Sequence, residues 1–297
     1  MAVERGECFD RITLGVICRT RHEFLRRLRY EGAVSEELAS LDGTIAQAGE
    51  TSVPITDEGF LRGDGAFEVV RVYGGVPFLL DEHLDRMEIS GANLRLDGGI
   101  QRAECEREAG ELLARRDPEG FDGCLRLVQT RAGHRLLVTE PLPQPPERLR
   151  CAFVTFAPTR VLDGVKSLSY AANMLCGRLA RERGFDEALL VTPHGRVLEA
   201  PTSSLFWVDG EGRLCTPPLD DHILASITRA HLLELLEVEE RSVTKEELLE
   251  ANEAFIASTT REVHSISAIE AREFPETGEV TRKAAAAFRA HVESLLG

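Results

Sequence analysis

The segment Gly164-Val165-Lys166-Ser167-Leu168-Ser169-Tyr170 decides how the rest of the chain is interpreted. Lysine occurs only three times in the sequence, at positions 166, 245 and 283, and arginine carries most of the positive charge. Lys166 follows a predicted apolar strand over 151–156 and precedes a predicted helix of small and apolar residues. A desolvated lysine loses its proton readily and attacks carbonyl groups, which arginine cannot do. From this segment alone, a reactive lysine and an ordinary loop lysine are equally open interpretations.

The composition is typical of a soluble globular protein. The chain has 297 residues, enough for two domains, with 43% hydrophobic and 29% charged residues. Its formal net charge is -15, which argues against nucleic acid or an anionic membrane as a partner. No apolar run approaches the roughly 20 residues of a membrane span. We therefore expect small-molecule partners, no nucleic acid and no membrane.

The cysteines indicate a reducing compartment. Seven cysteines are spread along the chain without a C-x-x-C pair, so neither a zinc site nor a disulfide framework is predicted. The first residues lack the charged-then-apolar pattern of a signal peptide. We expect a cytoplasmic protein without a bound metal.

A proline-rich run divides the chain. Pro141-Leu142-Pro143-Gln144-Pro145-Pro146 cannot lie inside a helix or strand, so we predict an interdomain linker over 141–148. A small N-terminal α/β domain is expected at 33–140 and a C-terminal domain at 149–297. Residues 1–32 are predicted to be an N-terminal extension, and no function is assigned to them.

Local patterns predict the elements of both domains. Asp42-Gly43 indicates a tight hairpin turn, 66–73 reads as a strand that returns over 76–80, and Asp81 is a suitable helix N-cap. Residues 53–65 read as a glycine-rich connection. Further elements are expected as follows: helices at 100–116, near 227 and from about 280, and strands near 124–131, 134–140, 151–156, 187–191, 196–199, 204–208, 213–216, 254–258 and 263–268.

Several polar residues of the second domain, together with Arg86, supply the groups that pyridoxal phosphate requires. A lysine can hold the aldehyde, and a carboxylate such as Glu199 can favour the protonated ring nitrogen. A helix N-terminus with hydroxyl groups and an arginine can bind the phosphate. Each residue also has an ordinary interpretation as a surface charge, helix cap or turn residue, so the specificity lies in their order and spacing.

Over about 38–297 the chain resembles the class IV aminotransferases, the fold-type-IV pyridoxal phosphate enzymes. This group includes branched-chain aminotransferases, D-amino acid aminotransferases and 4-amino-4-deoxychorismate lyases. The resemblance rests on seven segments in the family's order: Asp57 to Arg71, Asp81 to Arg86, Val165 to Leu168, Glu187 to Glu199, Ser204-Leu205-Phe206, Ile227-Thr228-Arg229 and Ser258 to Val263.

The resemblance implies a fold and a role for each matched residue. The fold is α/β (α+β), with a smaller N-terminal α/β domain and a larger C-terminal pseudo-barrel domain. Lys166 is similar to the Schiff-base lysine and Glu199 to the partner of the pyridine nitrogen. The implied phosphate-binding residues are Arg86, Ser226, Ile227, Thr228 and Thr259, and Thr259 has the substrate carboxylate as its alternative partner. Phe67, Tyr170 and Thr260 are expected to line the substrate pocket.

Three departures from the family pattern concern the substrate and the phosphate. Ser226 stands where glycine is usual, and its side chain is expected to reshape the phosphate site. Arg62 replaces an aromatic residue, and the hairpin loop over 130–135 is short. The candidates to bind a substrate carboxylate are Arg62, Arg71, Arg131 and Arg135. For each of them, the alternative is an ordinary solvated arginine on the surface.

We predict a transaminase that moves an amino group between an amino acid or amine and a 2-oxo acid such as 2-oxoglutarate, by a ping-pong mechanism. Lys166 serves as its general acid and base. The nearest alternative is a lyase that eliminates pyruvate from 4-amino-4-deoxychorismate. A non-catalytic relative and an unrelated α/β binding domain are further alternatives. The resemblance also implies a homodimer in which each small domain closes over the partner's pocket.

Overall fold

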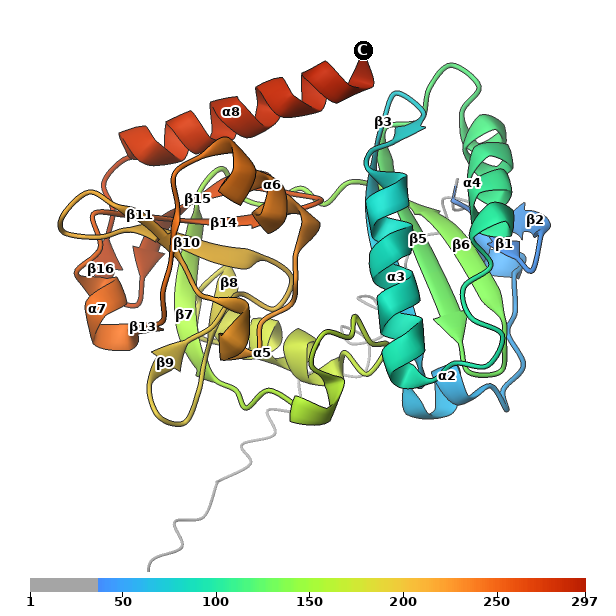
Figure 1. The fold of residues 1–297 in the computed structure, drawn as a ribbon, viewed down its shortest axis with the longest axis horizontal. Helices are drawn as coiled ribbons and strands as arrows, with labels where there is room; N and C mark the ends of the chain where they lie inside the picture. Colours follow the sequence, from blue (N-terminus) through green and yellow to red (C-terminus); the bar gives the residue numbers. More distant parts are fainter. Residues whose placement is uncertain (1–36) are drawn as a thin grey trace, which may run out of the picture. The chain divides into compact units, whose positions relative to one another are not determined.

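The computed structural model describes residues 37–297, whose strands form two β-sheets (Figure 1). The predicted extension at 1–32 lies outside the described residues. The first sheet is antiparallel throughout and has the order β2-β1-β6-β5-β3-β4. Its strands are β1 (Leu38–Leu41), β2 (Thr44–Gln47), β3 (Gly65–Tyr73), β4 (Val76–Pro77), β5 (Gly123–Thr130) and β6 (Arg135–Glu140).

Two helices, α3 (Leu80–Leu94) and α4 (Arg102–Arg116), cover one face of the first sheet (Figure 1). Their apolar side chains recur every three or four residues, which places them on a single helix face. The core of this layer contains Leu84 and Leu112 from the helices and Val70 from the sheet, all fully buried. The layer therefore gives β3 and α3 a rigid base.

The predicted Asp42-Gly43 hairpin is confirmed. Leu41 pairs with Thr44 across the turn, and both turn residues have positive φ, 50° for Asp42 and 89° for Gly43. Two successive left-handed residues match the twist of the flanking strands, and Asp-Gly adopts them at little cost.

The second sheet is mixed, with the order β12-β11-β10-β14-β15-β7-β8-β9-β13 and β16 paired to β15. Its strand β7 is parallel to both neighbours, β15 and β8. These strands are β7 (Leu149–Thr155), β8 (Glu187–Val191), β9 (Arg196–Val197), β10 (Ser204–Val208), β11 (Leu214–Thr216), β12 (Glu239–Glu240), β13 (Val243–Thr244), β14 (Glu253–Ser258), β15 (Glu262–Ile269) and β16 (Arg272–Glu273).

Helices pack on this sheet at two places. Helices α6 and α8 contact each other and β14, while α5 contacts β7 and β8 (Figure 1). Phe288 and Val292 of α8 pack with Phe255 of β14 in a buried cluster. The helices of this part are α5 (Ala171–Glu182), α6 (Ile227–Leu235), α7 (Lys245–Leu249) and α8 (Glu279–Leu296), with short 3-10 turns η2 (Arg160–Leu162) and η3 (Leu219–Asp221).

Residues 141–146, between the two sheets in the sequence, form neither helix nor strand, as the prolines predict. The division into two domains stays a prediction, because 37–297 form one compact unit. No helix within the described residues is long and apolar enough to cross a membrane.

Three local predictions need correction. Helix α3 starts at Leu80, after Leu79 in a left-handed conformation, so Asp81 lies in the first turn and is not the cap. The connection over 53–65 contains a short helix, α2 (Glu58–Arg62), which Asp57 caps by accepting the Gly59 N–H at 2.6 Å. The strand predicted at 76–80 ends after Pro77, because the chain turns there into α3.

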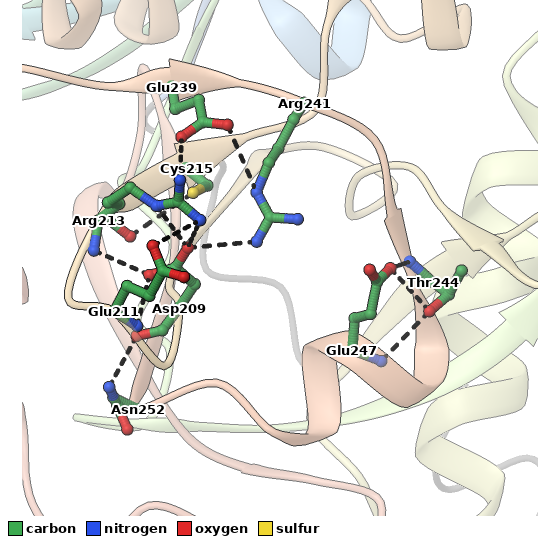
Figure 2. A network of polar contacts seen from close by, with 9 residues as sticks. All are labelled: Asp209, Glu211, Arg213, Cys215, Glu239, Arg241, Thr244, Glu247 and Asn252. Atoms are coloured by element: carbon green, nitrogen blue, oxygen red, sulfur yellow. Dashed lines mark hydrogen bonds and ion pairs between the residues drawn. The ribbon is translucent and has the colours of Figure 1, made fainter.

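A polar network stabilises the loops around β11 and β12 (Figure 2). Asp209 accepts hydrogen bonds from the backbone N–H groups of Glu211 and Arg213, and its backbone carbonyl accepts one from Asn252 at 2.7 Å. Thr244 forms a capping box with Glu247 at the start of α7. These contacts serve local structure.

Candidate active site

The backbone around Lys166 is hydrogen-bonded to the first sheet. Phe67 of β3 donates its N–H to the Lys166 carbonyl at 3.0 Å, and Leu168 donates its N–H to the Gly65 carbonyl at 2.9 Å. The Lys166 N–H donates to Ser90 Oγ of α3 at 3.0 Å. Elements of the N-terminal half therefore hold the lysine segment in place.

The Lys166 side chain enters a cavity of about 420 Å³. Many of the predicted site residues share this cavity. They are Phe67, Arg86, Lys166, Tyr170, Glu199, Ser226, Thr259 and Thr260. The structure thus brings together residues that are distant in the sequence.

The Lys166 amine lies in an apolar, aromatic environment. Its Nζ is 4.4 Å from the ring centroid of Phe67 and 5.8 Å from that of Tyr170, and the two rings meet edge to face. Burial lowers the pKa of Lys166 to about 8, although the charge of Glu68 favours the protonated form. Among residues 37–297, no hydrogen bond or ion pair holds Nζ. The amine is therefore partly uncharged near neutral pH and available for reaction.

Glu199, at the far end of the β8–β9 hairpin, is a buried carboxylate that lines the cavity. Burial raises the pKa of Glu199 to about 7, and a hydrogen bond from the Leu224 N–H at 3.2 Å opposes this shift. The charge of Lys166 also favours the ionised form. A cationic ring nitrogen placed beside Glu199 would stabilise the carboxylate further.

Arg86 is held by a buried carboxylate on β3. Its Nε and Nη2 donate to the two oxygens of Glu68 at 2.8 and 2.6 Å, and His83 Nδ1 lies 2.8 Å from Glu68 Oε2. Burial alone would raise the pKa of Glu68, but the hydrogen bonds from Arg86 and His83 outweigh it and hold that pKa at about 2. A third nitrogen, Nη1, donates to the Ala225 carbonyl at 3.0 Å. Arg86 thus lies beside the start of α6.

The start of α6 provides backbone donors. The first N–H groups of a helix have no partner within the helix and favour an anion. Ser226 is the N-cap, and its Oγ accepts the Arg229 N–H at 3.3 Å. Its side chain is therefore engaged in the cap, in ordinary extended backbone geometry that does not require glycine. Ile227 and Thr228 are buried in the first turn and do not line the cavity with their side chains.

Two further hydroxyl groups of the cavity belong to segments that match the family pattern but received no individual role from the sequence. Ser204 Oγ and Ser258 Oγ are buried, line the cavity and have no hydrogen-bond partner in the described part of the chain. Buried hydroxyls are normally paired, so these two point to a polar ligand. With an available amine, a carboxylate and an arginine beside a helix start, the residues present fit pyridoxal phosphate.

The four arginines predicted to meet a substrate carboxylate do not line this cavity. Arg71 is buried against Asp122 and the Gly123 carbonyl, and Arg135 is buried against Glu108. These two predictions need correction, because carboxylates and carbonyl groups of the same chain already engage both guanidinium groups, and neither residue lines the cavity.

Arg62 and Arg131 are engaged by this chain's own groups outside the cavity. Arg62 is exposed on α2 and pairs with Glu58. Arg131 pairs with Asp64 and donates to the Leu94 carbonyl at 2.7 Å. A role for either residue in a partner's pocket stays a prediction.

One cationic group of the cavity to which the sequence interpretation gave no role is Arg126 of β5. It lines the cavity together with Glu140 of β6, and its guanidinium lies 5.6 Å from the Phe67 centroid. The pattern of β5 places every second side chain on one face, but nothing in the sequence distinguishes Arg126 from the other strand arginines.

Comparisons with known proteins agree with this geometry. The sequence model of the amino-transferase class IV family matches residues 65–269. The chain is 34% identical to a D-alanine aminotransferase from Bacillus licheniformis over 250 residues, covering 77% of this chain and 87% of that protein. It is 33% identical to a putative branched-chain-amino-acid aminotransferase from Methanocaldococcus jannaschii, covering 82% and 92%. An aminodeoxychorismate lyase from Bacillus subtilis is 28% identical over 266 residues, covering 81% and 89%.

Solved structures show the same fold. A fold IV-transaminase from Curtobacterium pusillum superposes with a TM-score of 0.77 at 28% identity, covering 87% of this chain and 99% of that one. The predicted fold class, fold-type-IV α/β, is confirmed. The chain belongs to the class IV aminotransferases, a family of pyridoxal-phosphate-dependent enzymes.

Proposed function

We propose that this protein binds pyridoxal phosphate and transfers an amino group from an amino acid or amine to a 2-oxo acid. The observation that carries the proposal is the Lys166 amine, whose pKa is lowered to about 8 and which faces a cavity shared with Glu199 and Arg86. When bound, the cofactor supplies an aldehyde and an electron-withdrawing ring.

The chain's own residues have distinct tasks in this proposal. Lys166 Nζ holds the aldehyde, then takes the α-proton of the amino donor and keeps it for return. Glu199 stabilises a proton on the ring nitrogen. Arg86 and the N–H groups at the start of α6 bind the phosphate, with Thr259 beside them.

Lys166→Ala tests the central assignment. The wild-type protein reconstituted with pyridoxal phosphate should show a near-visible absorption band and transfer amino groups in a ping-pong pattern, and the variant should lose both. A variant that keeps the near-visible band would refute the role of Lys166.

A second candidate is the elimination of pyruvate from 4-amino-4-deoxychorismate, which the lyase from Bacillus subtilis favours as a relative. A transaminase requires an acceptor, whereas a lyase releases pyruvate without one. Product analysis with and without 2-oxoglutarate or pyruvate as acceptor distinguishes the two reactions.

The predicted homodimer also belongs to this proposal. Arg62 and Arg131, outside their own chain's cavity, are the residues that a partner's pocket would use. Sedimentation of the purified protein tests the assembly, and a monomer with full transaminase activity would refute this role.

A further inference from the structure

Within the described residues, three arginines line the cavity, and one of them differs from the others in how its charge is balanced. Arg86 pairs with Glu68, and Arg261 pairs with Glu187 at 2.7 Å. Both of these carboxylates are buried and neither lines the cavity, so the charges of Arg86 and Arg261 are neutralised by groups outside the cavity.

The charge of Arg126 is neutralised by a carboxylate that itself lines the cavity. Its Nε and Nη2 donate to the two oxygens of Glu140 at 2.6 and 2.9 Å, and both partners line the cavity. The pair is bidentate, the geometry in which guanidinium groups also bind substrate carboxylates. Its side chains are about one-third exposed, 35% for Arg126 and 32% for Glu140, so an incoming carboxylate can compete.

The position of the pair suits a substrate side chain. The Phe67 ring is contacted by Lys166 Nζ at 4.4 Å and by the Arg126 guanidinium at 5.6 Å. The Lys166 amine and the ion pair therefore lie close to the same aromatic side chain. A substrate whose reacting carbon meets Lys166 has its far end within reach of Arg126 and Glu140.

We propose that Glu140 is a specificity-determining residue that occupies the guanidinium of Arg126 and so disfavours substrates with a second carboxylate. This inference rests on the proposed transaminase function. A dicarboxylate such as 2-oxoglutarate must displace Glu140 to reach Arg126, whereas a monocarboxylate such as pyruvate leaves the ion pair intact.

The test uses the half-reaction of the acceptor, which does not depend on the identity of the amino donor. Holoenzyme loaded with pyridoxamine phosphate is mixed with pyruvate or 2-oxoglutarate, and the second-order rate constants are followed by absorbance. Glu140→Gln should raise the ratio of the 2-oxoglutarate rate to the pyruvate rate by about tenfold, equal to 1.4 kcal/mol. Because a partly exposed ion pair adds little stability, the variant is expected to fold.

Two further variants separate masking from a general charge effect. Glu211→Gln removes one negative charge from an exposed loop outside the cavity and should leave the ratio at its wild-type value. In an Arg126→Gln background, Glu140→Gln should no longer raise the ratio of the 2-oxoglutarate rate to the pyruvate rate. The reason is that this background has no Arg126 guanidinium for Glu140 to occupy.

The outcomes are distinct. A ratio in Glu140→Gln within twofold of the wild-type ratio, or an equal rise without Arg126, overturns the inference while the transaminase function stands. Wild-type holoenzyme that transfers its amino group to neither acceptor overturns the proposed function and this inference together.

Discussion

The substitution Glu68→Gln tests how Arg86, the arginine proposed to bind the phosphate, is held. Glu68 is fully buried, and its pKa falls from an ordinary 4.5 to about 2 because Arg86 and His83 donate to it. Each pKa unit corresponds to 1.36 kcal/mol, so the ionised carboxylate contributes on the order of 3 kcal/mol to folding at neutral pH. Removing one partner of a buried ion pair typically costs about 3–5 kcal/mol, which agrees with this magnitude.

The pH dependence gives a second check on the same residue. The folded-state pKa lies below the unfolded one, so the contribution is complete above about pH 4.5 and is lost as the pH falls toward 2. In urea unfolding at pH 7, the free energy of unfolding of Glu68→Gln should be about 3 kcal/mol below that of wild type. At pH 3.5 this difference should be smaller by roughly 1 kcal/mol. The affinity for pyridoxal phosphate should fall as well.

The control for this experiment is Glu211→Gln, which changes the same functional group at an exposed position. It should unfold at the same urea concentration as wild type. If the free energies of unfolding of Glu68→Gln and wild type at pH 7 differ by less than about 0.5 kcal/mol, the reasoning about the buried pair is refuted. Differences of that size are usual for surface substitutions.

Three more predictions concern the cavity and its support. The rate of covalent cofactor uptake should rise with pH up to about 8 and then level off, because the uncharged Lys166 amine is the nucleophile; a pH-independent rate measured by stopped-flow absorbance would contradict this. Glu199→Gln should lower kcat by about 10²-fold with the cofactor still bound, since the amide has no charge to stabilise a protonated ring; unchanged kcat would remove Glu199 from the mechanism. Gly65→Ala should lower stability by about 1–3 kcal/mol in urea unfolding, because the added Cβ meets the Gln129 carbonyl oxygen, while Gly49→Ala, which meets nothing within 4 Å, should not; equal effects of the two alanines would argue against a tight contact at Gly65.

Local patterns in the sequence sufficed for the two elements that flank Lys166 and for one hairpin turn of the first sheet. The apolar strand before it, the small-residue helix after it and the Asp42-Gly43 turn all depend on short-range periodicity or turn geometry, and the structure confirms them. The start of α3 was predicted two residues too late, because Leu79 takes a left-handed conformation that its side chain does not signal.

The partners of the arginines could not be predicted in the same way. Whether Arg71 or Arg126 faces a cavity depends on strand register, on the face that α3 and α4 cover and on carboxylates far along the chain. Arg71 meets Asp122 across 51 residues, and Arg126 meets Glu140 from the adjacent strand. Such pairings become visible only when the sheet is assembled.

The anchoring of the lysine segment to β3 has a consequence for the way the molecule moves. The carbonyl of Lys166 and the N–H of Leu168 are joined to backbone groups of the first sheet, on the other side of the proline-rich connection. Hinge-like opening between the two halves would either break these hydrogen bonds or draw the Lys166 amine away from Glu199. We therefore expect small molecules to enter and leave through smaller displacements of loops. Proteolysis within 141–148 should yield two fragments that remain associated and keep the near-visible absorption band of the reconstituted protein.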